Sequence, residues 1–232
     1  QLGRKSYENR SLGRKGSLGD WIGLQLAGIL VFRKIRKKLG GRLRFFISGG
    51  APLSKELAEF FYAAGILILE GYGLTETSPV IAVNTEQEFK FGTVGKPLPN
   101  VQVKIAADGE ILTAGPCVML GYYKNEQATA EVLQEGWFHT GDIGEFDAEG
   151  YLKITDRKKD IIATSGGKKV APQNLEMMIQ NDPLFSQVVI IGDKRNYLTA
   201  LIVPHKDEVL RKARELNLES VPWETLLKEP AI

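Results

Sequence analysis

The feature that most constrains what this chain can fold into is residues 70–77, which read EGYGLTET. They follow an apolar run, residues 66–69, which we predict to be a buried strand. Gly71 and Gly73 allow the backbone to turn sharply or to approach a ligand closely, and the flat ring of Tyr72 could stack on a nucleobase. The strand therefore ends in groups suited to chemistry rather than to packing.

Thr75 and Glu76 complete this stretch. Threonine offers a hydroxyl of the kind that reaches phosphate oxygens, and a carboxylate is a hard oxygen ligand of the kind that Mg²⁺ takes beside a substrate phosphate. Taken alone, such an octapeptide could equally be a glycine-rich turn with polar ends. The rest of the chain decides between these two interpretations.

The composition excludes several classes of protein. A net charge of +2 over 232 residues gives no indication of a nucleic-acid partner. The single cysteine, Cys117, excludes an internal disulfide framework and fits a reducing compartment. We therefore expect a cytoplasmic protein.

The first 44 residues are strongly basic. Residues 1–20 are rich in Gly, Ser, Lys and Arg without periodicity, and we expect a loop or disorder there. Residues 22–39 indicate a helix that ends at Gly40, and the apolar run within it is shorter than the roughly 20 residues that span a bilayer. The segment could make peripheral contact with an anionic membrane surface, although a solvated helix face is the interpretation that we favour.

The next segments predict a βαβ unit. We expect a strand at residues 43–47 and a helix at residues 55–64 with Ser54 as its N-cap, before the strand that leads into residues 70–77. The apolar face of this helix would carry Leu57, Phe60 and Phe61.

The two strands of such a unit run parallel. Ligands of parallel sheets bind outside the carboxyl ends of the strands. Glycine-rich turns occupy both of these ends, at residues 49–52 and 71–76. We therefore predict that the two turns lie side by side around one pocket.

The pattern of predicted secondary structure changes twice after this unit. Residues 91–157 indicate short strands, with a hairpin turn at Asp108-Gly109 and a short helix at residues 127–132. We interpret His139 in this region as structural. Later segments follow the order βαββα, with strands at 161–163, 188–192 and 198–203 and helices at 172–180 and 207–216.

The fold class is therefore α/β. A parallel-sheet βαβ portion and a small β-rich region form one domain, residues 1–158, and a small α+β domain follows at residues 159–232.

Four motifs in series resemble those of the adenylate-forming, or AMP-binding, superfamily. They are SGGAP at 48–52, GYGLTET at 71–77, WFHTGD at 137–142 and DRKKD at 156–160. Within the superfamily they are most similar to long-chain fatty acid–CoA ligases. The resemblance covers nearly all of the chain after about Leu39, and it makes residues 1–158 the C-terminal part of the large adenylation domain and the remainder a truncated, mobile C-terminal domain.

The resemblance implies a nucleotide site for ATP or AMP. The first turn would line the adenine pocket with its backbone, and the tyrosine of the second motif would stack on adenine. The implied nucleotide-binding residues in these two motifs are Gly50, Ala51, Pro52, Glu70, Gly71, Tyr72, Gly73 and Thr75.

Other roles also follow from the resemblance. Thr75 would contact the α-phosphate, Glu76 would hold Mg²⁺, Asp142 would bind the ribose hydroxyls and Arg157 would contact ribose or phosphate. A carboxylate suits a diol because it can accept from both hydroxyls. Thr75, Glu76 and Arg157 would be the catalytic residues.

Three further implied cofactor-binding residues belong to the small domain. Lys159 would lie at the hinge between the domains, and Gly166 and Gly167 would lie near the path of the pantetheine arm. In the implied reaction a fatty carboxylate attacks the α-phosphorus of ATP and releases pyrophosphate, and the thiol of coenzyme A then displaces AMP from the acyl-adenylate. Rotation of the small domain would separate the two steps.

The chain also departs from the family pattern. No phosphate-binding loop rich in Ser, Thr and Gly precedes Arg42, and Lys228 does not fit the context of the family's adenylation lysine. We therefore expect an internal fragment of a longer ligase that is inactive by itself. Exposed sheet edges and apolar faces in such a fragment could lead to a homodimer.

Three alternatives stay open at this point. The parent could be a fatty acyl-AMP ligase or an adenylation domain that loads a carrier protein, since the residues of the acyl pocket are mostly absent. The chain could also be a non-catalytic module that binds AMP. The motif at residues 156–160 favours an acyl-CoA ligase.

Overall fold

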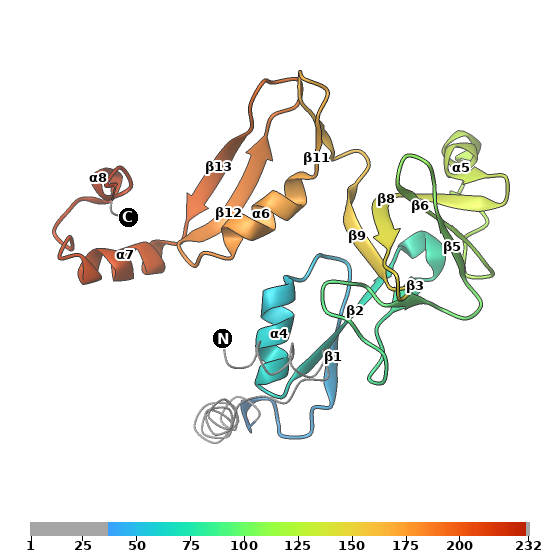
Figure 1. The fold of residues 1–232 in the computed structure, drawn as a ribbon, viewed down its shortest axis with the longest axis horizontal. Helices are drawn as coiled ribbons and strands as arrows, with labels where there is room; N and C mark the ends of the chain where they lie inside the picture. Colours follow the sequence, from blue (N-terminus) through green and yellow to red (C-terminus); the bar gives the residue numbers. More distant parts are fainter. Residues whose placement is uncertain (1–36, 231–232) are drawn as a thin grey trace. The chain divides into compact units, whose positions relative to one another are not determined.

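The computed structural model describes residues 37–230 (Figure 1). The chain divides into two compact units, of which the first extends to Ile154 and the second is Thr155–Ile232. The expected disorder at residues 1–20 and most of the expected helix at residues 22–39 lie outside the described residues. Within residues 37–230, every helix is too short or too polar to span a bilayer.

A four-stranded sheet forms the first part of the first unit. Its strands are β1 (Phe45–Ser48), β2 (Leu67–Gly73), β3 (Val80–Val83) and β4 (Lys96–Pro97), in that spatial order. The pairing of β1 with β2 is parallel, with Ser48 opposite Glu70, which confirms the predicted βαβ unit. The pairings of β3 with β2 and with β4 are antiparallel.

Helix α4 (Lys55–Ala63) connects β1 to β2 and packs beside them (Figure 1). The Ser54 hydroxyl accepts a hydrogen bond from the Leu57 amide at 3.2 Å, which confirms the predicted N-cap. The apolar face of the helix is largely exposed, because Leu57 and Phe60 are 45% and 54% exposed. The helix buries Ala58 and Glu59 instead, and a side chain as small as alanine lets a helix approach a strand closely.

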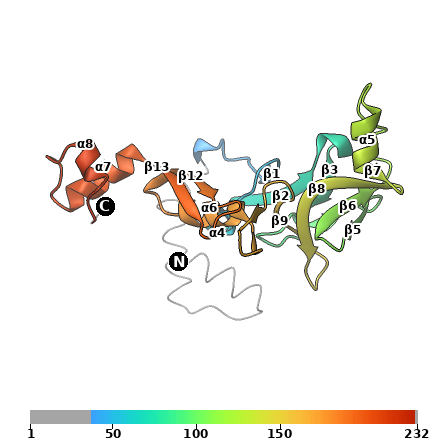
Figure 2. The ribbon, with the colours of Figure 1, turned by 90° about the horizontal axis from the view of Figure 1, so that it is seen from above.

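A five-stranded sheet forms the rest of the first unit, and its last strand in the sequence, β9, continues past Ile154 into the second unit. Its strands are β5 (Gln102–Ile105), β6 (Glu110–Ala114), β7 (Leu133–Gln134), β8 (Trp137–Phe146) and β9 (Leu152–Arg157). The order is β5-β6-β8-β7, and β9 also pairs with β8. Helix α5 (Glu126–Val132) leads directly into β7 (Figure 2). The hairpin at Asp108-Gly109 and the short helix are thus confirmed.

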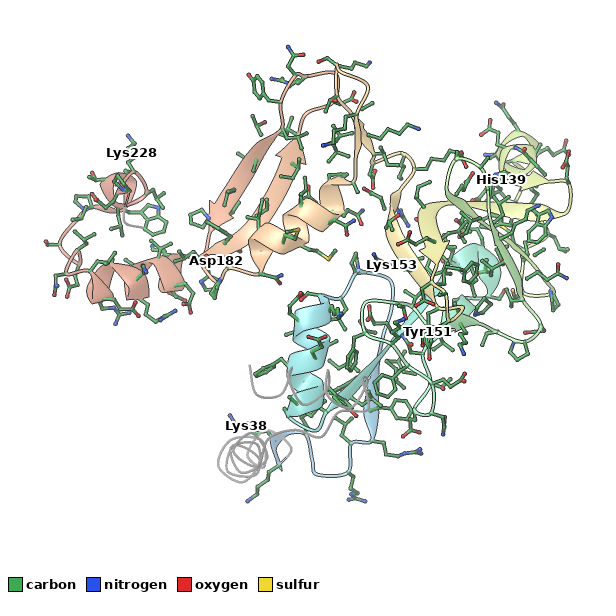
Figure 3. All side chains as sticks on the ribbon, in the orientation of Figure 1. Lys38, His139, Tyr151, Lys153, Asp182 and Lys228 are labelled. Atoms are coloured by element: carbon green, nitrogen blue, oxygen red, sulfur yellow. The ribbon has the colours of Figure 1, made fainter. Side chains whose placement is uncertain are left out.

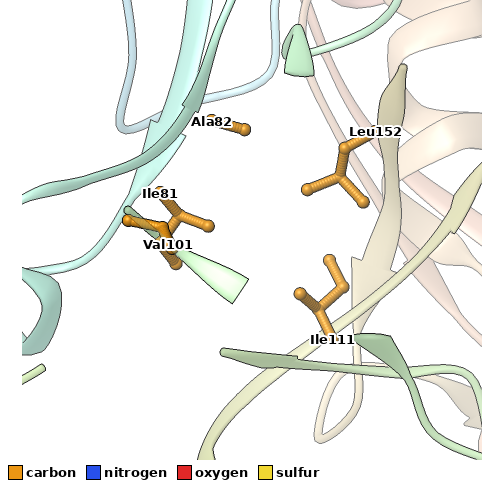
Figure 4. Packing of buried hydrophobic residues seen from close by; sticks show 5 residues of the cluster. All are labelled: Ile81, Ala82, Val101, Ile111 and Leu152. Carbon is orange, nitrogen blue, oxygen red and sulfur yellow. The ribbon is translucent and has the colours of Figure 1, made fainter. Parts of the chain in front are cut away.

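One apolar core lies between the strands of both sheets (Figure 4). Its buried members come from β3, β6, β9 and the segment before β5, and they are Ile81, Ala82, Val101, Ile111 and Leu152. Because each sheet contributes side chains to the same cluster, the two sheets of the first unit are held against each other.

The second unit contains two small hairpins and three helices among the described residues. These elements are β10 (Ile162–Ala163), β11 (Lys169–Val170), α6 (Pro172–Gln180), β12 (Phe185–Ile191), β13 (Thr199–Pro204), α7 (Lys206–Glu215) and α8 (Trp223–Leu226). The predicted order βαββα is confirmed, and β11 and α8 are additions to it. Pro172 lies in the first turn of α6, where its lack of an amide proton costs nothing. Lys228 follows α8 (Figure 3).

The position of the core predicts that substitution of two leucines changes the free energy of unfolding by very different amounts. Leu152 is fully buried and Leu120 is fully exposed. We expect Leu152→Ala to lower the free energy of unfolding of the first unit by about 2–5 kcal/mol, and Leu120→Ala to change it by less than about 0.5 kcal/mol. A urea titration monitored by hydrogen exchange of peptides from β3 and β6 measures the unfolding free energy of both variants. Equal changes in the two variants would contradict the assigned core.

Candidate functional site

The two glycine-rich turns lie side by side at the carboxyl ends of β1 and β2, as the topology predicts. A Cβ atom on Gly49 would lie 3.3 Å from the carbonyl oxygen of Gly71. Gly50 has a φ of 79°, which favours glycine. Ala51 and Pro52 are exposed, so the backbone of the first turn is open to a ligand.

Gly73 fixes how the chain leaves β2. A Cβ atom at this position would overlap the carbonyl oxygen of Pro79, so that only glycine fits. The chain then enters the 3₁₀ turn η2 (Thr75–Thr77). The buried hydroxyl of Thr77 accepts from the Leu74 amide at 3.0 Å and contacts the carbonyl oxygen of Pro79 at 2.9 Å. These contacts hold the turn that presents Thr75 and Glu76.

Tyr72 and Asp142 join the two sheets at this end of the first unit. The Tyr72 hydroxyl, on β2, donates a hydrogen bond to Oδ2 of Asp142, on β8, at 2.7 Å. Asp142 is only 4% exposed, and the Tyr72 ring packs against the apolar core. The structure thus brings together two residues that the sequence assigned to adenine and ribose, 70 positions apart.

Glu110 holds the strand segment that carries Asp142. Its Oε1 accepts a hydrogen bond from the Gly141 amide at 2.9 Å, and its Oε2 lies 3.1 Å from Nδ1 of His139. The Asp142 amide donates to the Thr140 hydroxyl at 3.1 Å. Figure 3 marks His139, which lies on β8 beside β6. Sequence reasoning missed Glu110, because a single glutamate in a short strand forms no pattern that indicates its contacts.

Glu76 is the predicted Mg²⁺ ligand. Its Oε1 accepts a hydrogen bond from the Tyr122 hydroxyl at 2.9 Å. Burial, and then this hydrogen bond to Glu76, raises the pKa of Tyr122. The described residues hold no group of three His, Cys, Asp or Glu side chains that could form a complete protein cage for a metal. A single carboxylate fits Mg²⁺ that takes its other ligands from phosphates and water.

Glu70 lies at the start of the motif and is 9% exposed. Burial raises the pKa of its carboxyl to about 7, and a hydrogen bond from the Gly92 amide at 3.4 Å opposes this only weakly. A proton therefore leaves this carboxyl near neutral pH, two residues before Tyr72.

The other predicted site residues belong to the second unit. Arg157 and Lys159 are exposed, and Gly166 and Gly167 lie in the exposed loop between β10 and β11. The adjacent Asp156 is 2% exposed and accepts a hydrogen bond from the Arg157 amide at 2.6 Å. Burial, followed by the charges of Asp160 and Glu176, raises the pKa of Asp156. The roles of these four predicted residues stay predictions.

Comparison with known protein families gives two matches. The family model of the AMP-binding enzymes matches residues 21–123, and the model of the AMP-binding enzyme C-terminal domain matches residues 159–228. Together they cover most of the chain.

Two curated relatives are named as long-chain acyl-CoA ligases or synthetases. The chain is 51% identical over 173 residues to the long-chain-fatty-acid–CoA ligase FadD15 of Mycobacterium tuberculosis, a match that covers 75% of this chain and 29% of that protein. It is 40% identical over 223 residues to long chain acyl-CoA synthetase 1 of Arabidopsis thaliana, which covers 89% and 34%. The chain thus spans about a third of the length of these relatives.

Solved structures show the same fold. The o-succinylbenzoate CoA synthetase of Bacillus subtilis in complex with its acyl-adenylate intermediate superposes with a TM-score of 0.65 at 31% identity, over 74% of this chain and 39% of that one. The same enzyme in complex with ATP and magnesium ion gives a TM-score of 0.63 at 34% identity, over 70% and 37%. The mixed α/β architecture of this chain is that of adenylate-forming enzymes.

The buried carboxyl of Glu70 predicts a pH-dependent stability. The unfolded chain loses this proton near pH 4.5, whereas the folded chain keeps it until about pH 7. Stability therefore falls as pH rises through this window, by about 2 kcal/mol between pH 5 and pH 8. Glu70→Gln should remove this part of the pH dependence and stabilise β2 at pH 8.

Hydrogen exchange of β2 peptides in urea, compared at the two pH values, measures the effect. Glu135→Gln, at an exposed position, is the matched control and should leave the pH dependence unchanged. A native pH dependence in Glu70→Gln would contradict the assignment.

Proposed function

Because the chain belongs to the family of AMP-binding enzymes, we propose that it supplies the adenosine-binding part of a long-chain fatty acid–CoA ligase. The observation that carries this proposal is the hydrogen bond from Tyr72 to Asp142, which places an aromatic ring and a carboxylate together beside the two glycine-rich turns. The long-chain relatives favour a fatty carboxylate as the acid and coenzyme A as the thiol.

The predicted adenosine-binding residues of the first unit divide the work in this proposal between adenine and ribose. The exposed backbone of Gly50, Ala51 and Pro52 lines the adenine pocket, and Tyr72 offers its ring to adenine. The hydrogen bond from Tyr72 fixes one oxygen of Asp142, so that the carboxylate is oriented before a ribose diol arrives. Orientation in advance reduces the entropy lost on binding.

Thr75 and Glu76 serve the phosphate end. The turn η2 presents the Thr75 hydroxyl to the α-phosphate and Glu76 to Mg²⁺. When bound, Mg²⁺ would neutralise the charge that builds on the phosphate oxygens as the fatty carboxylate attacks. In this proposal Thr75 and Glu76 position the phosphates and the cation.

The second unit would serve the thioester step. We assign ribose or phosphate contact to Arg157, the hinge to Lys159, and the pantetheine path to Gly166 and Gly167. The guanidinium of Arg157 suits contact with phosphate because its planar fork binds anionic oxygens in pairs. An exposed hairpin loop without side chains at two positions gives a narrow thiol arm room to pass.

Calorimetric measurement of AMP binding to this chain tests the proposal. Asp142→Asn should weaken binding by about tenfold to a hundredfold, because a hydrogen bond to a charged group contributes about 1.5–3 kcal/mol. Tyr72→Phe keeps the ring and removes only the hydroxyl, so we expect a loss of about twofold to tenfold.

Asp108→Asn is the matched control. Asp108 is an exposed residue of the β5–β6 turn whose side chain accepts from the Glu110 amide, a bond that asparagine can keep. Its affinity for AMP should equal that of the unaltered chain. Binding that survives Asp142→Asn in full, or no binding by the unaltered chain, would contradict the proposal.

A further inference from the structure

One segment contacts Glu76 at two points. The Met119 amide donates a hydrogen bond to the carbonyl oxygen of Glu76 at 2.8 Å, and the Tyr122 hydroxyl donates to its Oε1 at 2.9 Å. Backbone and side chain of Glu76 are therefore both held by residues 119–122. Sequence reasoning gave no role to this segment, which lies between β6 and α5.

Tyr122 is itself fixed by helix α5. Its amide donates to the hydroxyl of Thr129 at 2.9 Å, and that hydroxyl donates to the carbonyl oxygen of Asn125, the N-cap of α5, at 2.8 Å. The preceding Gly121 approaches Thr129 so closely that a Cβ atom would lie 2.8 Å from its methyl group. A chain of contacts thus runs from α5 through Tyr122 to Glu76.

This arrangement has a consequence for the two carboxylate oxygens. Among the described residues, the hydrogen bond on the Glu76 carboxylate falls on Oε1, so that Oε2 is the oxygen left for another ligand. A glutamate side chain that is held in one rotamer does not pay its rotamer entropy again when it binds. Hydrogen bonds to a ligating carboxylate from outside the metal's own shell commonly raise metal affinity.

We propose that Tyr122 is a positioning residue for Glu76, which it holds in the rotamer that binds a divalent cation on the nucleotide phosphates. This inference rests on the proposed function. In this proposal Tyr122 acts through Glu76, the residue that its hydroxyl contacts, so its loss should affect the cation and spare the adenosine half of the site.

The test measures Mn²⁺ binding to the full chain by electron paramagnetic resonance, in the presence of a saturating non-hydrolysable ATP analogue. Tyr122→Phe should weaken Mn²⁺ binding by about tenfold. The matched control is Tyr123→Phe, because Tyr123 is the adjacent tyrosine and is 88% exposed. It should leave Mn²⁺ affinity unchanged.

Metal-free AMP binding and thermal unfolding of the same variants separate this proposal from its alternatives. Weaker Mn²⁺ binding with unchanged AMP binding and melting temperature supports the positioning role. Unchanged Mn²⁺ binding in Tyr122→Phe overturns it, and a parallel loss of Mn²⁺ and AMP binding overturns it in favour of a structural role. If the unaltered chain does not bind AMP, the proposed function fails first and this inference fails with it.

Discussion

The shared apolar core of the first unit is the constraint on which the candidate site depends. Ile81 from the first sheet and Ile111 and Leu152 from the second pack into one cluster. Only because the sheets are held together there can the Tyr72 hydroxyl on β2 reach the carboxylate of Asp142 on β8. The site is therefore a product of sheet-on-sheet packing, and the glycine-rich turns supply its open edge.

Sequence reasoning predicted best where local rules decide. The parallel βαβ unit, the N-cap at Ser54 and the turn at Asp108-Gly109 all follow from residue type and spacing, and the structure confirms them. It did not decide which face of helix α4 is buried, and the structure exposes Leu57 and Phe60 and buries Ala58. Periodicity identifies an apolar stripe but not which stripe a neighbouring strand will cover.

Sequence reasoning named residues of the candidate site but not the contacts between them. The motifs named Tyr72, Glu76 and Asp142, but the hydrogen bonds to Asp142 and Glu76 join positions 70 and 46 apart. The partners Glu110 and Tyr122 carried no sequence signal, because long-range hydrogen bonds depend on tertiary packing that spacing does not encode. The roles predicted for residues of the second unit, such as Arg157, remain predictions.

The most direct measurement is a crystal structure of the chain bound to a non-hydrolysable analogue of a fatty acyl-adenylate. We predict adenine against the ring of Tyr72 and both ribose hydroxyls within hydrogen-bonding distance of Asp142. An analogue bound elsewhere, or bound with its ribose turned away from Asp142, would contradict the claim that these two sheets build a nucleotide site.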